Sequence, residues 1–385
     1  MSIRSDIFSV AFIADIHFGS LSSEELYNEL KKNFLDKICN KKLDMVVFGG
    51  DLFHSIITMN YSTSHYVLLF MKEVLEVCKA NNIKYIRLIQ GTMSHDNNQL
   101  NNFAIYENRT DIDFKIFRTV GTEELAEGIK ILYVPEEYMS NPEEYYREYL
   151  DETKGKQYDF IFGHGMFRDV AFIAKKQESE VTMSKAPIFD SKVFESVCKG
   201  PIYFGHIHIK TNVRHNIFYP GSFSRFKHGE EADKGWYLCI YNKDTSDYKH
   251  EFIVNDMAKT YVTILVNLTD KSEAIDIINI VKMGLKQNDY IKLKIVINEN
   301  VDSSYILARV NEEFSNNKRV KLDVKNNFEF KQEIEEDKLV QKIYDKYNFL
   351  FDEGLSHEDK IQKFIKVKKD KVVPIDIIKK MLKII

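Results

Sequence analysis

Short apolar runs that end near aspartate or histidine constrain the fold of this chain more than any other feature of its sequence. Helix-like segments at residues 23–39 and 64–80, with apolar residues at helical spacing, separate the first three runs. Alternating strands and helices predict an α/β domain in which sheets and helices form separate layers. The strand candidates are FSVAFIA (8–14), LDMVVFGG (43–50), IKYIRLIQ (83–90), IKILYVP (129–135), YDFIFGHG (158–165) and PIYFGH (201–206).

Side chains of the kind that bind metal ions stand at or just after the ends of most of these runs. A single Asp-x-His or His-x-His pair would carry little weight, because such pairs arise often by chance. In an open α/β sheet, however, the carboxyl ends of the strands form the crevice where sites are built. The repeated pattern therefore predicts one shared site. Its members are Asp15, His17, Asp51, His54, His95, Asp96, His164, His206 and His208.

The pattern changes after Pro220 and predicts two further segments. YLCIY and HEFIV are short strands that would complete a sheet edge. From Lys259 onward, three β-rich stretches alternate with helical stretches at 272–285 and 303–314, which predicts a small β-α-β-α-β unit. We expect three parts: a catalytic domain, a small α+β capping domain and a helical tail. Their boundaries are 1–256, 257–332 and 333–385.

The predicted tail ends in a helix that begins at Pro374 and carries an apolar stripe on one side. Nine lysines and four acidic residues lie between Glu358 and Lys383. This helix either packs on its own domain with a solvated lysine face or binds a partner protein through the stripe. The stripe consists of Ile377, Ile378, Met381, Leu382 and Ile385.

Composition excludes several classes of protein. The four cysteines include no CxxC pair, which argues against a thiolate zinc site and for a reducing, cytoplasmic compartment. No apolar run approaches the roughly 18 residues of a membrane span, so no membrane association is expected. The formal net charge of −4 gives no global attraction for nucleic acid, so such binding would need a local basic surface or bound cations.

The ordered motifs resemble those of the calcineurin-like metallophosphoesterase superfamily, whose pattern is DxH, GDxx[DH], GNH[DE], H and GHxH. This chain carries DIH (15–17), GDLFH (50–54), GTMSHD (91–96), GHG (163–165) and GHIH (205–208). His54 and the later stretch YPGSFSRFKHGEEADKGWY are most similar to the SbcD-type DNA repair nucleases and their phage relatives. The resemblance implies a layered β-sandwich flanked by helices, followed by a small cap and a helical tail.

The resemblance also assigns roles to the motif residues. Two divalent ions are implied, and manganese is favoured on family grounds because oxygen and imidazole ligands alone do not select one metal. The paired ions would polarise the phosphate and activate the attacking water. In this assignment Asp15, His17 and His208 hold one ion, His164 and His206 hold the other, and Asp51 bridges them.

Three further motif residues are assigned to catalysis. His95 is the candidate general acid for the leaving oxygen, a role worth about 10² to 10⁴ in rate. His54 would lie beside it and orient either His95 or the phosphate, and Asp96 completes the motif.

The third motif departs from the family pattern. Asparagine normally precedes the catalytic histidine and donates an amide oxygen to the second metal, whereas here that position is Ser94. Three interpretations remain: Ser94 or Thr92 binds the metal directly, water replaces the amide, or the chain is a noncatalytic scaffold. Because the other ligands are present, we expect an active enzyme with a more weakly bound second metal.

The leading hypothesis is a DNA exonuclease and endonuclease that works with an SbcC-type ATPase in repair, recombination or replication. A homodimer is implied by the resemblance alone. The alternatives are a phosphatase or phosphodiesterase acting on small or phosphoprotein substrates, and a scaffold for the ATPase. Candidate DNA contacts near the site are Arg168, Lys175, Lys176, Arg225 and Lys227.

Overall fold

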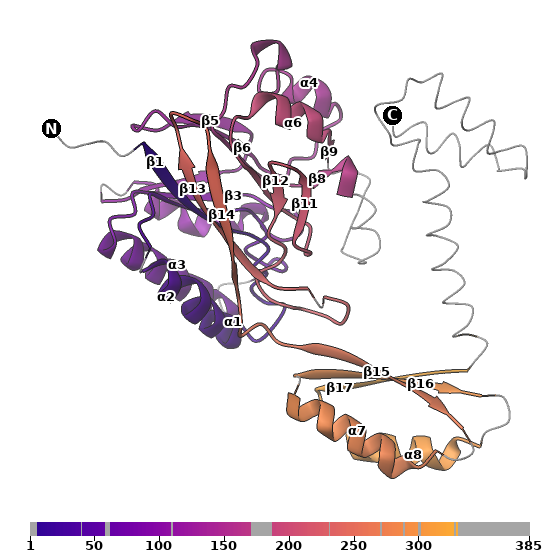
Figure 1. Cartoon of the computed structure of the whole chain (residues 1–385). Coiled ribbons are helices and arrows are strands. Elements are labelled where there is room, and N and C mark those ends of the chain that lie inside the picture. The colour runs from indigo at the N-terminus through magenta and orange to yellow at the C-terminus, as the bar shows by residue number, and fades with distance from the viewer. Residues whose placement is uncertain are drawn as a thin grey trace, which may run out of the picture. The chain divides into compact units, whose positions relative to one another are not determined.

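The computed structural model divides the chain into two compact units (Figure 1). The first comprises Met1–Val262 with Asn288–Tyr290, and the second comprises Thr263–Gln287 with Ile291–Ile385. The predicted tail at 333–385 lies outside the described residues. These residues are 6–39, 41–57, 62–108, 111–170, 187–230, 232–269, 272–287, 289–298, 302–326 and 329.

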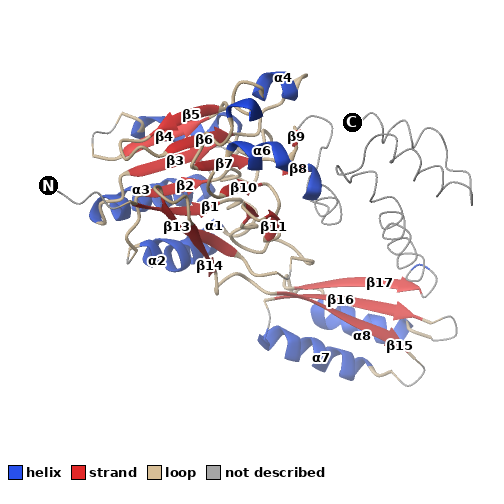
Figure 2. Ribbon diagram, turned by 45° about the horizontal axis from the view of Figure 1, so that its top comes forward, coloured by secondary structure: helices blue, strands red, loops and turns tan. Residues whose placement is uncertain are grey.

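Two six-stranded sheets form the centre of the first unit (Figure 2). The order of the first sheet is β14-β13-β1-β2-β3-β4, and that of the second is β11-β12-β10-β7-β6-β5. The strands of the first sheet are β1 (Ile7–Ile13), β2 (Met45–Phe48), β3 (Tyr85–Ile89), β4 (Asp113–Phe117), β13 (Gly235–Asn242) and β14 (Tyr248–Val254). Those of the second are β5 (Gly121–Glu124), β6 (Lys130–Val134), β7 (Phe160–His164), β10 (Ile202–Gly205), β11 (Thr211–Arg214) and β12 (Ile217–Tyr219).

Alternate residues of the central strand β1 enter different cores, which is why this strand is almost entirely apolar. Phe8, Val10 and Phe12 of β1 join Phe160 and Phe162 of β7 in one buried cluster between the sheets. The intervening residues of β1 pack with helical residues in a second cluster. Strands with continuous apolar sequences are expected to be buried on both faces, and this burial fixes the register of each strand.

Helices cover the outer faces of both sheets. Leu26, Leu30 and Phe70 from the helices beside the first sheet share a core cluster with Val46 and Ile86 of its strands. The smaller helices pack against the second sheet in the same way. On the first sheet these elements are α1 (Ser23–Leu30), the π-helical turn Lys31–Leu35, α2 (Asp36–Ile38) and α3 (Ser62–Ala80). On the second they are α4 (Pro142–Tyr146) and α6 (Ser191–Val197).

Parallel pairing brings the carboxyl ends of the site-bearing strands together. β1, β2, β3 and β4 pair in parallel, as do β6, β7, β10 and β12. Backbone hydrogen bonds connect the loop after β1 to the loop after β2. Asp15 N donates to Gly50 O at 3.1 Å, and His17 N donates to Asp51 O at 3.0 Å. Glu136 N donates to Gln90 O at 3.1 Å, which joins the end of one sheet to the end of the other.

The second unit contains the β-α-β-α-β order predicted for it. A three-stranded sheet of order β15-β16-β17 carries α7 (Ala274–Gln287) and α8 (Ser304–Phe314). Its core includes Val281, Leu293 and Val310, all buried. The strands are β15 (Tyr261–Leu268), β16 (Tyr290–Ile297) and β17 (Val320–Asn326). The division between units falls at Val262, six residues after the boundary predicted at 256.

The α/β layered fold is therefore confirmed, with details that the sequence pattern missed. The segment predicted as one helix at 23–39 contains a π-helical turn at Lys31–Leu35. Strand β5, with the sequence GTEE, has no apolar alternation and was not predicted. Within the described ranges, no helix is long and apolar enough to cross a membrane.

Candidate metal centre

One group of ligand atoms joins the end of β1 to the loop after β10. Asp15, His17 and His208 each place a ligand atom within 4.8 Å of the others. His17 Nε2 lies 2.9 Å from His208 Nε2, and Asp15 Oδ1 lies 3.9 Å from that same His208 nitrogen. A carboxylate and two imidazoles are a donor set that suits a divalent transition metal.

A second group lies at the ends of β6, β7 and β10. Glu136, His164 and His206 also place their ligand atoms within 4.8 Å of one another. Glu136 Oε2 lies 3.1 Å from His206 Nδ1 and 3.8 Å from His164 Nε2. His164 and His206 are the two residues that the motif pattern assigned to the second ion, whereas Glu136 was not among the candidates.

Asp51 lies between the two groups. Its Oδ2 atom is 3.8 Å from His17 Nε2 in the first group and 3.3 Å from His164 Nε2 in the second. Its other oxygen, Oδ1, accepts a hydrogen bond from Thr92 N at 2.6 Å. This position is the one that a carboxylate bridging two cations requires.

The hydrogen bonds of His164 fit a metal ligand. Its Nδ1 atom lies 2.8 Å from the carbonyl oxygen of Gly49, so Nδ1 carries the proton and donates it. The Nε2 atom is buried without a hydrogen bond, although Asp51 and Glu136 carboxylate oxygens lie near it. A cation between these atoms would satisfy them all, and a carbonyl partner on the far nitrogen is the usual support for a histidine ligand.

Several site residues adopt a backbone conformation that is rare for residues other than glycine. The φ angles of Asp15, His17 and Asp51 are 51°, 53° and 51°, and that of His206 is 99°. Each such residue costs about 1–3 kcal/mol, and strain of this kind gathers at functional sites. The surrounding fold must therefore stabilise these conformations.

The buried charges of the metal-free site perturb one another strongly. Burial alone would raise the pKa of Asp51, but the imidazoles of His164 and His17 hold it well below its usual range. Burial would lower the pKa of His164, but Asp51 and Asp15 hold it well above its usual range. Burial together with His208 lowers the pKa of His17. A metal ion would compete with the proton on His164.

A cavity of about 200 Å³ opens beside these groups. His54 and His95 lie on its wall, with their rings stacked at a centroid distance of 5.7 Å. His95 Nδ1 bonds to the carbonyl oxygen of His54, which fixes the orientation of the ring. The lining is completed by His17, Ser20, Asp51, Thr92, His206, His208, Phe226, Lys227 and Glu230.

Asp96 supports the loops of the site and is not one of the residues that line the cavity. Its carboxylate accepts hydrogen bonds from Asp51 N at 2.9 Å, Gly91 N at 2.8 Å and Phe53 N at 3.2 Å. Burial, followed by the charge of Asp51, raises the pKa of Asp96 to about 7. This geometry makes Asp96 a positioning residue that holds the GDLFH and GTMSHD loops together.

A buried ion pair supports His208. Glu230 Oε1 lies 3.4 Å from His208 Nδ1, and Glu230 Oε2 lies 3.2 Å from Lys234 Nζ. Lys234 Nζ also donates to the carbonyl oxygen of His208 at 2.8 Å and to Ser222 Oγ at 2.7 Å. A carboxylate behind a ligating imidazole fixes its orientation and raises its basicity.

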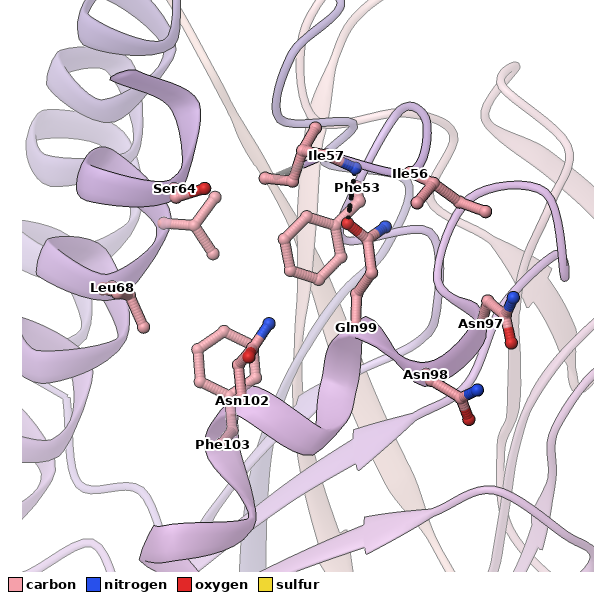
Figure 3. Close-up of a pocket in the computed structure, with 11 residues that line it drawn as sticks. Phe53, Ile56, Ile57, Ser64, Leu68, Asn97, Asn98, Gln99, Asn102 and Phe103 are labelled. Carbon is pink, nitrogen blue, oxygen red and sulfur yellow. Dashed lines mark hydrogen bonds between the residues drawn. The ribbon is translucent and has the colours of Figure 1, made fainter. Parts of the chain in front are cut away.

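A separate hollow lined by apolar and uncharged polar residues lies between α3 and the 3₁₀ helix Asn97–Tyr106 (Figure 3). Phe53, Leu68 and Phe103 line it, and none of its lining residues is titratable. Gln99 Oε1 accepts from Ile57 N at 2.8 Å, and Gln99 Nε2 donates to Ser55 O at 3.1 Å. Gln99 therefore holds the segment after His54 in place, and the lining of the hollow offers no group for acid–base catalysis.

Comparison with known proteins agrees with this geometry. The family model of the calcineurin-like phosphoesterases matches residues 8–210, which is more than half of the chain. The chain belongs to the calcineurin-like phosphoesterase family. It is also similar to "Putative phosphoesterase 244L" of Invertebrate iridescent virus 6, with 25% identity over 248 residues covering 62% of this chain and 77% of that protein.

As a calcineurin-like phosphoesterase, the chain is a hydrolase of phosphate esters, and its family typically depends on divalent metals. The described residues supply clustered ligands for such ions. The structure brings together the six aspartate and histidine ligands inferred from the motifs, and it places His54 and His95 beside them.

Ser94 is the predicted metal ligand that the structure does not bring to the site. It is exposed and is not a lining residue of the cavity. Thr92, directly after Gly91, is buried there instead, with Oγ1 at 3.3 Å from Asp51 Oδ2. Met93 and Ser94 are both exposed, between the buried Thr92 and His95.

Glu136 is the site residue that the motif pattern missed. It belongs to none of the motifs of the phosphoesterase superfamily, but it stands two residues after β6 in the stretch YVPEE. A carboxylate just after a predicted strand is the same positional signal that identified Asp15 and Asp51. Applied to every strand, this rule would have included Glu136.

The basic residues predicted to contact DNA have different environments. Lys227 is exposed on the cavity wall. The guanidinium of Arg225 instead donates to the carbonyl oxygens of Glu230, Ala258 and Ala232. Arg225 therefore fixes a loop of this phosphoesterase. Lys175 and Lys176 lie outside the described residues.

Proposed function

We propose that this phosphoesterase is a metal-dependent DNA nuclease that hydrolyses phosphodiester bonds with two divalent ions, manganese being favoured. One observation carries the proposal: an exposed cation and an aromatic ring, Lys227 and Phe226, line the same cavity as the ligand groups. Both residues belong to the stretch YPGSFSRFKHGEEADKGWY, which resembles SbcD-type nucleases.

The ligand groups suit a phosphodiester as substrate. Two divalent ions at such a site supply charge to the phosphate oxygens and lower the pKa of an attacking water. Asp51 lies between both groups, so it orients the two halves of the site relative to each other.

His95 is proposed to protonate the leaving sugar oxygen. Its Nδ1 is held by the carbonyl oxygen of His54, which orients the ring on the cavity wall. His54, stacked on His95, stabilises the orientation of that ring. Proton transfer by a positioned histidine contributes about 10² to 10⁴ in rate.

Phe226 and Lys227 are proposed to hold the nucleic acid next to the scissile bond. The ring of Phe226 packs edge-on against His17 at a centroid distance of 5.3 Å, which fixes it at the mouth of the site. Aromatic rings stack on unpaired bases, and a lysine pairs with phosphate as a point charge. This combination favours a strand whose bases are exposed.

A small phosphodiester or phosphomonoester is the second candidate substrate. The cavity volume of about 200 Å³ accommodates a single phosphate ester with few additional atoms. A cavity of this size is below the roughly 300–1,000 Å³ of typical small-molecule pockets, so a substrate bound mainly outside the cavity is preferred.

The proposed partners are DNA, an SbcC-type ATPase and a second copy of the chain. They follow from the resemblance to SbcD-type nucleases, together with the apolar stripe in the sequence PIDIIKKMLKII. The tail would dock on the ATPase by its apolar side. If deletion of residues 370–385 leaves the complex with the ATPase intact, the last helix is not the docking element.

The test is an assay with end-labelled single- and double-stranded DNA in manganese, magnesium or zinc, with and without the ATPase. We expect manganese-dependent degradation that chelation abolishes. Hydrolysis of a cyclic nucleotide or p-nitrophenyl phosphate without degradation of DNA would replace this proposal with the small-substrate function. Absence of all hydrolysis in every metal would favour a scaffold.

A further inference from the structure

We propose that Glu136 is an oxygen ligand of the second metal ion in this chain. It replaces the asparagine that the family pattern uses and that the sequence GTMSHD lacks. The inference deepens the proposed function and rests on its two-metal site.

The position of Glu136 supports ligation. Only 1% of the residue is exposed, and its Oε2 atom lies 3.1 Å from His206 Nδ1 and 3.8 Å from His164 Nε2. The two histidines come from different strands of the second sheet, so three ligand atoms converge from three strand ends. A buried carboxylate needs compensating charge or hydrogen bonds, and a cation among these atoms would provide the charge.

The surroundings hold Glu136 in this orientation. Tyr138 donates its hydroxyl to the other carboxylate oxygen, Oε1, at 2.9 Å. The backbone of Glu136 donates to Gln90 O at 3.1 Å, directly before the GTMSHD loop. Oε2 is thereby left facing the two histidines and Thr92 Oγ1, which is 3.4 Å away.

The loop sequence and Glu136 compensate for each other. Thr92 follows Gly91 as asparagine does in the family pattern, but its neutral hydroxyl is a poor metal ligand. Thr92 Oγ1 lies within 3.4 Å of both Asp51 Oδ2 and Glu136 Oε2, so the shorter side chain leaves room for the Glu136 carboxylate. An anionic ligand in place of a neutral amide adds one negative charge beside two dications, which strengthens binding of the second ion.

Ligation by Glu136 in place of asparagine also removes the reason to expect weak binding of the second metal ion. That expectation depended on the loss of the asparagine amide oxygen, with only Ser94, Thr92 or a water to replace it, and Ser94 is exposed. With Glu136 as ligand, the second group contains a carboxylate and two imidazoles, as the first group does.

The test is calorimetric titration of the metal-free full chain with Mn²⁺. We expect two ions to bind to the wild type, and Glu136→Gln to weaken the second at least about 100-fold while the first is unchanged. Loss of a residue that only orients a ligand costs roughly 10- to 100-fold, so a rescue variant distinguishes the two roles. Adding Thr92→Asn to Glu136→Gln restores an amide oxygen and is expected to recover most of the lost affinity.

Glu137→Gln is the matched control, because the Glu137 carboxylate accepts from Val120 N and the Tyr145 hydroxyl instead. It should bind both ions as the wild type does. Anomalous diffraction from Mn²⁺-loaded crystals supplies the direct readout: the second peak should lie about 2.2 Å from a Glu136 oxygen. A peak beyond bonding distance of Glu136, or unchanged binding by Glu136→Gln, overturns the inference.

Failure of the ligand assignment and failure of the proposed nuclease function would give different results. If wild-type chain degrades DNA in manganese but Glu136→Gln binds both ions normally, the ligand assignment is wrong and the function stands. If Glu136→Gln loses the second ion but the wild type cleaves no DNA, the ligand assignment stands and the nuclease proposal is wrong.

Discussion

His95 and Asp96 are adjacent in the sequence but serve the site differently. His95 lies on the cavity wall with its Nδ1 tied to the carbonyl oxygen of His54. Asp96 is fully buried and accepts three backbone N–H groups, two from the GDLFH loop and one from Gly91 in its own loop. Substitution of His95 should therefore affect the reaction, whereas substitution of Asp96 should affect the folded structure.

We predict that His95→Gln lowers the rate of phosphodiester hydrolysis by about 10² to 10⁴, because it removes the proton donor. Manganese binding should change little, since His95 belongs to neither ligand group assigned to the two ions, although its ring also places a ligand atom within 4.8 Å of those of His17 and His54. Steady-state hydrolysis of bis(p-nitrophenyl) phosphate with parallel calorimetry measures both. The control is His65→Gln, an exposed histidine on α3. Equal activity of the two variants would remove His95 from the mechanism.

We predict that Asp96→Ala destabilises the chain by about 3 kcal/mol, because buried N–H groups lose their acceptor. Urea denaturation monitored by circular dichroism measures this change. Asn98→Ala, at an exposed position of the following turn, should cost less than about 0.5 kcal/mol. If the free energy of unfolding falls no more in Asp96→Ala than in Asn98→Ala, water accepts the backbone N–H groups in place of the carboxylate.

Glu230 should make stability depend on pH. Burial alone would raise its pKa, but the hydrogen bond from His208 and the charge of Lys234 lower it to about 2. Because the folded-state pKa is below the unfolded-state value, the stabilisation is present above pH 4.5 and is lost as pH falls toward 2. Near pH 4 this group alone contributes roughly 1 kcal/mol per pH unit.

The measurement is urea denaturation of wild type and Glu230→Gln between pH 6 and 3.5. The free energy of unfolding of the wild type should fall more steeply with decreasing pH than that of the variant. Parallel curves would show that Glu230 titrates in the folded chain as it does in the unfolded one.

At the scale of elements, glycines let the strand ends approach each other. A Cβ atom on Gly91 would lie 2.2 Å from both Asp51 N and Asp51 Oδ1. We therefore predict that Gly91→Ala displaces the Asp51 carboxylate and lowers manganese affinity by at least about tenfold, as a shift of 1.4 kcal/mol would. Gly121→Ala in β5, where the nearest atom lies 3.7 Å away, is the control. Calorimetry that finds unchanged binding in Gly91→Ala would mean that the loop adjusts.

The central strands were predictable because their burial on both faces leaves continuous apolar runs. The ligands at the strand ends were predictable because the carboxyl ends of parallel strands lie at one edge of the sheet. β5 and β11 were not, because edge strands such as GTEE and TNVR carry no continuous apolar run. β4 (DFKIF) and β12 (IFY) were also missed, because their apolar stretches are very short or interrupted by charge. Glu136 was missed because a motif search reads one segment at a time, whereas its role depends on the contact of β6 with strands far away in sequence.

At the scale of the whole molecule, the net charge and the charge of the metal-free site both disfavour the approach of a polyanion. The chain carries a formal charge of −4, and three of its carboxylates, those of Asp15, Asp51 and Glu136, are concentrated at the site. Approach of a polyanion therefore requires that cations first occupy the site. We predict that metal-free chain binds single-stranded DNA at least about tenfold more weakly than chain loaded with Ca²⁺, a difference of 1.4 kcal/mol. Fluorescence anisotropy of labelled DNA measures this difference, and equal affinities would locate binding away from the metals.

The central claim is that the two ligand groups joined by Asp51 form one hydrolytic site. Its most direct test is stepwise addition of Mn²⁺ to the metal-free chain while hydrolysis of bis(p-nitrophenyl) phosphate is followed. The arrangement predicts no hydrolysis without metal and a rate that saturates only when two equivalents are bound. Full activity with one equivalent, or activity that persists after chelation, would contradict it.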